Sequence, residues 1–447
     1  TPEGLEIGRA QAVQAEAAGI PCHTDMNPVL LKPNSDQISQ VVLNGRPIGN
    51  SSAYDYFRRG GREELRLAVC SAFDRLSARY HPIVMEGAGS IAEINLRDRD
   101  IVNMPMARYA GADVFLVADI DRGGVFASAY GSVMLQTPED RRRIKGIIVN
   151  KFRGDIRLFE EGRRLMEEKC GVPVLGVIPY FHHIQIEEED SVELEQKHCR
   201  AVSGKVNVAV VKLVHMSNFT DFDRLERDER VHLYYTDRPD ELLKADIVLV
   251  PGSKATIDDL RGLWRTGMAE AIIKTASSGK TVMGICGGYQ MMGMEVADPD
   301  GVEGTALRTD GLGLLPVRTV IGSEKITRQV EYRFCGSEVL CRGYEIHMGH
   351  TAAAVASAPV PPLNRMADGT MDGCYLHRRC MGTYIHGILD NPAFLDFLLG
   401  PYVGPSVCEP AEDYAVYKNR QYDLLAAHVR SHMDMQKFYR ILSSEDV

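Results

Sequence analysis

The residues best suited to chemistry lie in the stretch TVMGICGGYQMM, which runs from Thr281 to Met292. A β-branched run leads into Gly284-Ile-Cys286-Gly287 and then into a helix-like segment. Small neighbours permit the sharp strand-to-helix turn that projects a side chain from a sheet. A helix N-terminus also favours the thiolate form of a cysteine. The pattern therefore predicts a nucleophilic Cys286, and the alternative is a buried structural cysteine beside a tight turn.

A thiol nucleophile needs a partner that moves protons. Of the 13 histidines, His386 is the best candidate, because the strand-like run GTYIHG delivers it to a glycine-bounded strand end. A negatively charged oxygen formed during attack on a carbonyl needs backbone N–H donors. Gly287 follows the nucleophile, and Gly252 lies in the loop VPGS after another predicted strand. These two residues are the predicted oxyanion hole.

Both halves of the chain read as α/β, because short apolar runs alternate with helical segments. We predict two doubly wound domains, residues 1–200 and residues 201–447, the second ending in a helical tail from Tyr414 to Leu442. The acidic segment from Gln185 to Lys205, which includes the run Glu187 to Asp190, is the predicted linker. The predicted strands are Pro82–Met85, Asp113–Asp119, Gly146–Asn150, Val174–Ile178, Val206–Val211, Ile247–Val250 and Thr281–Ile285, and helices are expected at Gly4–Ala18, Glu63–Arg79 and Ile156–Cys170.

Polar residues follow three of the predicted strands in the first half. Glu86, Asp119 and Asn150 each stand where a strand ends. Ligands of parallel sheets bind at the carboxyl ends of the strands, so these residues indicate a second site in the first domain.

The composition excludes several classes of protein. A net charge of −10 in 447 residues, without a basic stripe, argues against a nucleic-acid partner. The ten cysteines include no CxxC pair, so a zinc knuckle is not indicated. Without a signal peptide or a long apolar run, the pattern favours a cytoplasmic protein that does not bind membranes.

Many segments of the chain resemble the cobyric acid synthase family, whose class I glutamine amidotransferase domain matches the second half. The matching segments are Asp25-Met-Asn-Pro28, Leu31-Lys-Pro33, Glu86-Gly-Ala-Gly-Ser90, Asp119-Ile-Asp-Arg-Gly-Gly124, Ser217-Asn-Phe-Thr-Asp-Phe-Asp223, Pro251-Gly-Ser-Lys254, Gly284-Ile-Cys-Gly-Gly-Tyr-Gln290, Gly343-Tyr-Glu-Ile-His-Met-Gly349 and Gly382-Thr-Tyr-Ile-His-Gly387.

The resemblance implies ATP- and glutamine-dependent amidation of the b, d, e and g carboxylates of adenosylcobyrinic acid a,c-diamide, which gives adenosylcobyric acid in cobalamin biosynthesis. It implies that Cys286 attacks the glutamine amide, that His386 manages the protons, and that ammonia passes to a carboxylate activated by ATP. The partners implied are L-glutamine and a corrinoid.

The first half also resembles dethiobiotin synthetase, a carboxylate-activating P-loop fold. That likeness implies that Glu86 holds Mg²⁺ and that Asn150 contacts the adenine of ATP. Polar contacts to the corrin are expected from Asn27, Lys32, Asn95 and Arg122. The P-loop pattern itself occurs nowhere in the 447 residues. We expect it before Thr1, because the chain opens on a helix rather than a strand; without it, ATP binding should fail.

The chain departs from the family pattern at two positions. Ile388 stands where many class I amidotransferases carry the glutamate of a Cys–His–Glu triad. A third member would therefore come from elsewhere, with Asp390 or Glu345 as guesses. Ala255 stands where the family often has asparagine, a change of small effect if that loop contributes backbone groups.

Two other functions are compatible with the sequence. One is the sibling enzyme cobyrinic acid a,c-diamide synthase, against which the SNFTDFD and EIHMG segments argue. The other is a nucleotide-binding regulatory ATPase that carries an inert amidotransferase-like domain. That second function predicts no glutamine hydrolysis and no effect of Cys286→Ala.

Overall fold

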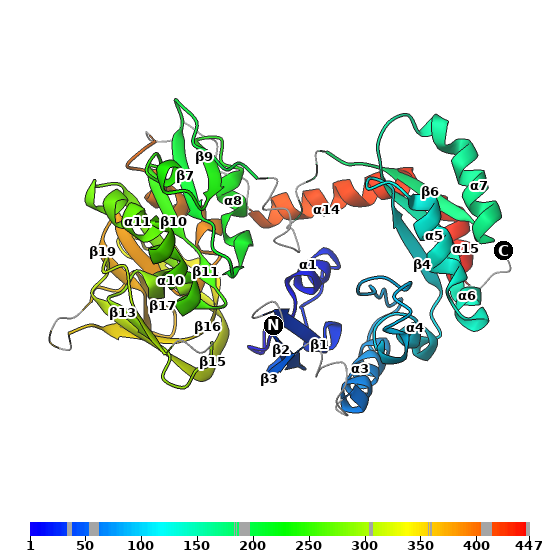
Figure 1. The fold of residues 1–447 in the computed structure, drawn as a ribbon, viewed down its shortest axis with the longest axis horizontal. Helices are drawn as coiled ribbons and strands as arrows, with labels where there is room; N and C mark the ends of the chain where they lie inside the picture. Colours follow the sequence, from blue (N-terminus) through cyan, green and yellow to red (C-terminus); the bar gives the residue numbers. More distant parts are fainter. Residues whose placement is uncertain are drawn as a thin grey trace. The chain divides into compact units, whose positions relative to one another are not determined.

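The computed structural model describes residues 1–33, 38–52, 62–182, 184, 186, 197–303, 307–355, 357, 360–403 and 414–443. The chain forms two compact units (Figure 1). The first unit comprises Thr1–Thr24, Leu30–Asn50 and Glu187–Ala411, and the second comprises Asp25–Val29, Ser51–Ile186 and Glu412–Val447. The acidic run predicted as a linker, Glu187 to Asp190, lies outside the described residues.

The first unit is built on a six-stranded sheet with the order β19-β20-β12-β10-β7-β9. Its neighbouring strands are parallel except for β19, which runs antiparallel to β20. Their bounds are β7 Val206–Val211, β9 Val231–Thr236, β10 Ile247–Val250, β12 Thr281–Ile285, β19 Cys374–His377 and β20 Cys380–Thr383. The three strands predicted in this half are confirmed with the expected bounds, because continuous apolar runs suit strands buried on both faces.

A second, mostly antiparallel sheet in this unit has the order β14-β13-β15-β16-β21, in which β13 is Glu295–Ala297 and β14 is Arg308–Asp310. It is dominated by the long hairpin of β15 (Val317–Phe334) and β16 (Cys341–Ala353), which the sequence reading missed. The strand β21 (Ile385–His386) pairs with β16, whereas β20 belongs to the first sheet. The chain therefore passes from one sheet to the other between Thr383 and Ile385. This change of sheet brings His386 to the meeting point of the two sheets.

The N-terminal residues of the first unit form α1 (Arg9–Ala17) and a three-stranded sheet of β1 (Val29–Pro33), β2 (Ile38–Leu43) and β3 (Arg46–Ser52). The helix predicted from Gly4 is thus shorter than expected, and these three strands were not predicted.

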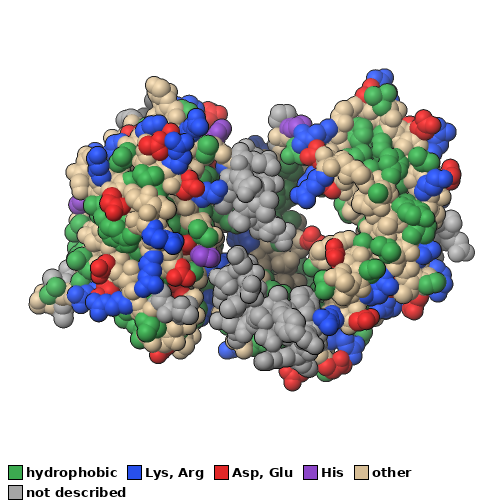
Figure 2. All heavy atoms as spheres, in the orientation of Figure 1, with side chains coloured by type: hydrophobic (Ala, Val, Ile, Leu, Met, Phe, Trp, Pro, Cys, Tyr) green, Lys and Arg blue, Asp and Glu red, His purple; other side chains and the backbone are tan. Residues whose placement is uncertain are grey.

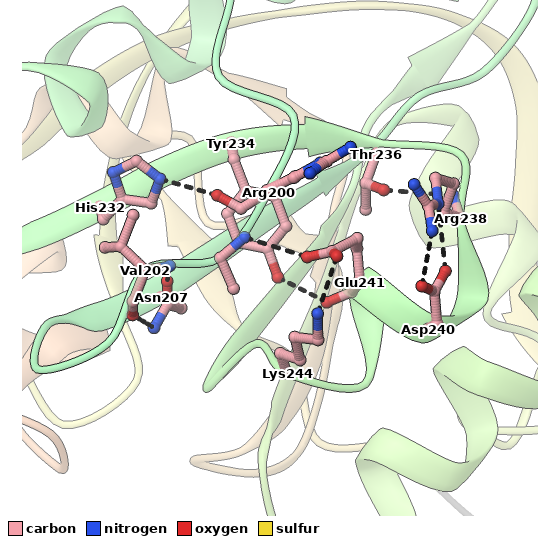
Figure 3. A network of polar contacts seen from close by, with 11 residues as sticks. Arg200, Val202, Asn207, His232, Tyr234, Thr236, Arg238, Asp240, Glu241 and Lys244 are labelled. Atoms are coloured by element: carbon pink, nitrogen blue, oxygen red, sulfur yellow. Dashed lines mark hydrogen bonds and ion pairs between the residues drawn. The ribbon is translucent and has the colours of Figure 1, made fainter.

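Elsewhere in the unit, α9 (Pro239–Leu242) carries a polar network around Glu241 (Figure 3). Glu241 accepts hydrogen bonds from the Ala201 amide at 3.2 Å and from Lys244 at 2.7 Å.

The second unit contains a parallel sheet with the order β4-β5-β6, formed by Val114–Asp119, Ile144–Phe152 and Val174–Pro179. The three corresponding predicted strands are confirmed. The strand predicted at Pro82–Met85 is wrong: these residues are not in a strand, and Val84 is 93% exposed. The apolar residues of this segment have no neighbouring strand to pair with. A local sequence pattern cannot show whether such a neighbour exists. The helices here are α3 (Arg62–Ser77), α4 (Met104–Ala110), α5 (Val125–Met134), α6 (Pro138–Arg143) and α7 (Glu160–Cys170).

The C-terminal tail folds as α14 (Tyr414–Ser431) and α15 (Met435–Leu442) and belongs to the second unit. Met433 forms an antiparallel bridge to Gly176 of β6, and the Asp434 amide donates to the Leu175 carbonyl at 2.7 Å. A Cβ at Gly176 would lie 2.6 Å from the His432 carbonyl oxygen, so glycine permits this approach. The sequence reading had assigned the tail to the amidotransferase domain. The division at residue 200 stays a prediction.

Hydrophobic side chains gather on the surface over α5 and α7 (Figure 2), where a shallow groove is lined by Phe126, Ala127, Tyr130, Leu165, Met166, Lys169 and Cys170. Within the described residues, no helix combines the length and the apolar character needed to span a bilayer.

Candidate active site

Cys286 stands on a tight turn between β12 and α12 (Gly287–Met291). Its backbone has φ 52° and ψ −111°, a conformation that costs energy for a non-glycine residue and clusters at functional sites. The Cys286 amide donates to the Thr383 carbonyl at 2.8 Å. The adjoining Gly288 touches the Val250 carbonyl so closely that any Cβ would collide with it. The turn predicted from the glycine spacing is therefore present.

The Cys286 sulfur lies close enough to the His386 ring to raise the pKa of the imidazole. The thiol also contacts the Ile346 carbonyl oxygen, with 3.6 Å between the atoms. Both residues are buried, with exposed fractions of 7% for Cys286 and 1% for His386. Burial lowers the pKa of His386, but the Asp221 carboxylate and the Cys286 sulfur outweigh it and raise the pKa to about 10. This electrostatic setting favours the protonated form of the His386 ring.

Asp221 is the residue that the sequence reading missed. Its Oδ2 lies 2.7 Å from His386 Nδ1, and its Oδ1 accepts the Gly387 amide at 2.9 Å. The two guesses lie elsewhere: Glu345 pairs with Arg328, and the Asp390 backbone carbonyl accepts from Arg224. Asp221 and His386 are 165 residues apart, so no local spacing could have joined them. The signal in the sequence was the SNFTDFD segment, which contains Asp221 and matches the family motif.

The same segment holds the face of the imidazole ring. The Tyr344 ring stacks on His386 with 5.2 Å between centroids and 22° between planes. Asn218, at φ 53°, donates from Nδ2 to the Tyr344 hydroxyl at 2.9 Å. Burial raises the pKa of Tyr344, so this phenol stays neutral. Residues 217–223 thus contact the edge of the His386 ring through Asp221 and hold the Tyr344 ring on its face through Asn218.

The two glycines predicted for the oxyanion hole lie beside the nucleophile. A Cβ built on Gly287 would be 2.7 Å from the Ser253 backbone nitrogen, and one on Gly252 would be 3.4 Å from His386 Cε1. The loop is held by Ser253, whose hydroxyl donates to Asp259 at 2.6 Å. Ala255 donates its amide to the Ser253 hydroxyl at 3.0 Å, so this position contributes backbone.

Further polar side chains meet around Gln290, which lies in the same helix as the turn. Gln290 donates to the Tyr384 hydroxyl and accepts from Thr256, both at 3.2 Å. Thr256 donates its amide to Glu303 at 2.6 Å, and burial raises the pKa of Glu303 to about 7. His347 stacks on Tyr384 with 3.7 Å between centroids, and burial lowers its pKa to about 4. These groups form a buried polar network beside the turn that carries Cys286.

Two of the three residues predicted at strand ends in the second unit, Asp119 and Asn150, lie near the carboxyl edge of its sheet, whereas Glu86 follows no strand. Asp119 and Asn150 are opposite each other in the register of β4 and β5, and Lys151 Nζ lies 3.3 Å from Asp119 Oδ2. Glu86 is exposed on a loop that Asn103 fastens through two hydrogen bonds to Ala88, at 2.9 and 3.1 Å. Within the described part of the chain, no three His, Cys, Asp or Glu side chains gather closely enough to hold a metal by themselves.

The four residues expected to contact the corrin do not fall in one unit. Lys32 lies in the first unit and pairs with the buried Glu6, and burial lowers its pKa to about 8. Asn27, Asn95 and Arg122 lie in the second unit, where Asn95 and Arg122 are exposed. Asn27 donates to the Val29 carbonyl at 3.3 Å. All four roles stay predictions.

Comparisons with known proteins define the class first. Residues 207–394 match the CobB/CobQ-like glutamine amidotransferase domain, and residues 56–188 match an AAA domain, so a glutamine amidotransferase is joined to a domain that indicates ATP use. The chain is 66% identical to cobyric acid synthases of Phocaeicola vulgatus and Bacteroides fragilis, covering 100% of this chain and 90% of each relative. It is 47% identical to that of Syntrophobacter fumaroxidans, covering 99% and 90%. The chain belongs to the cobyric acid synthase family, which confirms the resemblance and does not favour the two alternative functions.

Proposed function

We propose that this chain hydrolyses glutamine at Cys286 and uses the ammonia, together with ATP, to amidate the b, d, e and g carboxylates of adenosylcobyrinic acid a,c-diamide. The observation that carries the proposal is the buried set of Cys286, His386 and Asp221, in which the carboxylate is hydrogen-bonded to the imidazole and the sulfur acts on the pKa of the same ring. Full-length identity to cobyric acid synthases supports the choice of substrate.

The geometry assigns a task to each side chain. The Cys286 thiolate attacks the side-chain amide carbon of glutamine, and the His386 imidazolium protonates the departing ammonia. His386 then takes a proton from the water that cleaves the thioester, which releases glutamate. Asp221 keeps the Nδ1 proton on the ring and so leaves Nε2 for the reaction, as the carboxylate does in other triads. The backbone amides near Gly252 and Gly287 stabilise the oxyanion.

The second unit is proposed to use ATP and Mg²⁺. Carboxylate and amide oxygens beside a lysine at a sheet edge are the donors expected around a nucleotide with its metal. Glu86 would hold Mg²⁺, and Asn150 would contact the adenine. When bound, ATP supplies the phosphoryl group that activates a carboxylate towards ammonia. Asn27, Lys32, Asn95 and Arg122 are proposed to contact the corrinoid. The free thiols of the described cysteines fit a cytoplasmic location.

The reaction with defined corrinoids tests this function. The full-length protein is incubated with ATP, Mg²⁺ and glutamine, together with either adenosylcobyrinic acid a,c-diamide or cobyrinic acid, and the amide groups gained are counted by mass spectrometry. We expect amidation of the diamide at four carboxylates. Amidation confined to the a and c positions of cobyrinic acid would contradict the proposal and identify the sibling reaction.

A further inference from the structure

A buried carboxylate lies behind the strand that carries the catalytic histidine and contacts no group of the proposed triad. Asp372 belongs to β18 (Met371–Asp372) and has an exposed fraction of 6%. Its Oδ1 accepts the Tyr384 amide at 3.0 Å. Its Oδ2 accepts the Thr383 hydroxyl and, at 2.9 Å, the Asn364 side-chain amide. Three donors thus converge on one carboxylate within the core.

The hydroxyl of Thr383 connects this carboxylate to the backbone of the residues that follow. It accepts from the Asn364 side chain at 3.0 Å and from the Ile385 amide at 3.0 Å while it donates to Asp372. Asn364, Asp372 and Thr383, named here the Asp372 cluster, therefore hold residues 383–385, where the chain leaves one sheet and enters the other. A short hydrogen-bonded crossing of this kind fixes the backbone more tightly than packing alone.

Several residues of the segment held by the Asp372 cluster contact or belong to the proposed catalytic groups. The Thr383 carbonyl accepts the Cys286 amide at 2.8 Å and so supports the strained turn of the nucleophile. The Tyr384 hydroxyl bonds Gln290 and Thr351, at 3.2 and 2.6 Å, and its ring stacks on His347. His386 follows directly. Displacement of this segment by a few tenths of an ångström would move the nucleophile, its base and the neighbouring polar groups together.

We infer that Asp372 is a positioning residue for glutamine hydrolysis, because its carboxylate sets the segment 383–386 that places His386 against Cys286. This inference deepens the proposed function and rests on it. Burial raises the pKa of Asp372 to about 6, which is the electrostatic cost of keeping a carboxylate at this place.

Two variants and one exchange test the inference. Thr383→Val removes the bridging hydroxyl without a change of shape, and Asp372→Asn removes one acceptor and introduces donors that face Asn364. The exchange Asn364→Asp with Asp372→Asn restores one carboxylate and one amide, so that every donor regains an acceptor. Glu241→Gln is the control, since it alters another buried carboxylate of the same unit, on α9 (Figure 3).

The measurements are kcat and KM for glutamate release and the pH dependence of Cys286 alkylation by iodoacetamide. We expect each of the two variants to lower kcat about tenfold with KM within about threefold. We also expect the alkylation midpoint to rise by about one pH unit, because a displaced imidazolium stabilises the thiolate less. The exchange should return both quantities towards wild type.

The inference is overturned if Thr383→Val and Asp372→Asn both keep kcat and the alkylation midpoint of wild type, or if Glu241→Gln lowers kcat as much as they do. Thermal unfolding of each variant establishes that the fold is intact. The alkylation profile needs no turnover, so a shifted midpoint supports the inference even when glutamine is not hydrolysed. Absence of hydrolysis in the wild-type chain would contradict the proposed function and not the positioning role.

Discussion

The two units present their polar residues in different ways. In the first unit, Cys286, His386 and Asp221 have exposed fractions of 7% or less, and each is held by named hydrogen bonds. In the second unit, Glu86 is exposed, and the side chain of Asp119 is 37% exposed at the edge of the sheet. Buried groups keep one geometry before substrate arrives, whereas exposed groups acquire theirs from the ligand. We therefore expect the proposed glutamine site to be preorganised, and the proposed ATP site to take its geometry from the ligand that binds there.

The largest effect is expected at the member of the triad that local spacing did not reveal. Asp221→Asn should lower kcat for glutamine hydrolysis by about 10²–10⁴-fold, because an amide at this place can favour the wrong tautomer of His386. Asp390→Asn is the matched control. Equal losses of kcat in the two variants would contradict the assignment of Asp221 to the triad. Steady-state glutamate release measures both.

A substitution at the exposed, proposed ATP site should have the opposite effect and leave glutamine hydrolysis intact. Glu86→Ala should reduce ATP-dependent amide formation by about 10²-fold while glutamine hydrolysis continues, because a Mg²⁺ ligand acts only on the phosphoryl chemistry. Glu93→Ala, another exposed carboxylate nearby in the chain, is the control. Equal damage to hydrolysis and amide formation would count against the metal role. The two half-reactions are followed separately as glutamate and as corrinoid amide.

The docking of the tail onto the second unit gives a smaller effect on stability. Gly176→Val should cost about 1–3 kcal/mol of unfolding free energy, because the side chain would collide with the His432 backbone. Gly131→Ala in α5 has open space around its Cβ and should stabilise the unit by about 0.4–1 kcal/mol. Urea unfolding compares the variants. A tolerated valine would show that the tail does not pack on β6 as described.

The last effect is a slope of stability with pH. The pKa of His386 is raised from its usual 6.5 to about 10, so the folded state holds this proton more tightly than the unfolded chain. Its contribution is fully present below pH 6.5 and is lost as pH rises through about 10, with a slope of at most about 1.4 kcal/mol per pH unit. His386→Gln should flatten the slope in that window. An unchanged slope in this variant would assign the pH dependence to other groups.

Much of this architecture could be predicted from single segments. Continuous apolar runs predict the strands at 206–211, 247–250 and 281–285. The glycines around Cys286 predict the turn. Contacts between distant segments could not be predicted in this way. Asp221 meets His386 only because β20 and β21 belong to different sheets, and the tail reaches β6 only because Gly176 lacks a side chain. The prediction of a strand at Pro82–Met85 was wrong for the same reason, since an apolar run becomes a strand only where a neighbouring strand pairs with it.

The most direct measurement compares wild type with Cys286→Ser in two assays. Glutamate release from glutamine is measured first, and corrinoid amidation with high ammonium in place of glutamine is measured next. The account predicts that the serine variant releases no glutamate and retains ammonium-supported amidation at the wild-type level. Glutamate release by the serine variant at the wild-type rate would contradict the claim that this sulfur cleaves the amide.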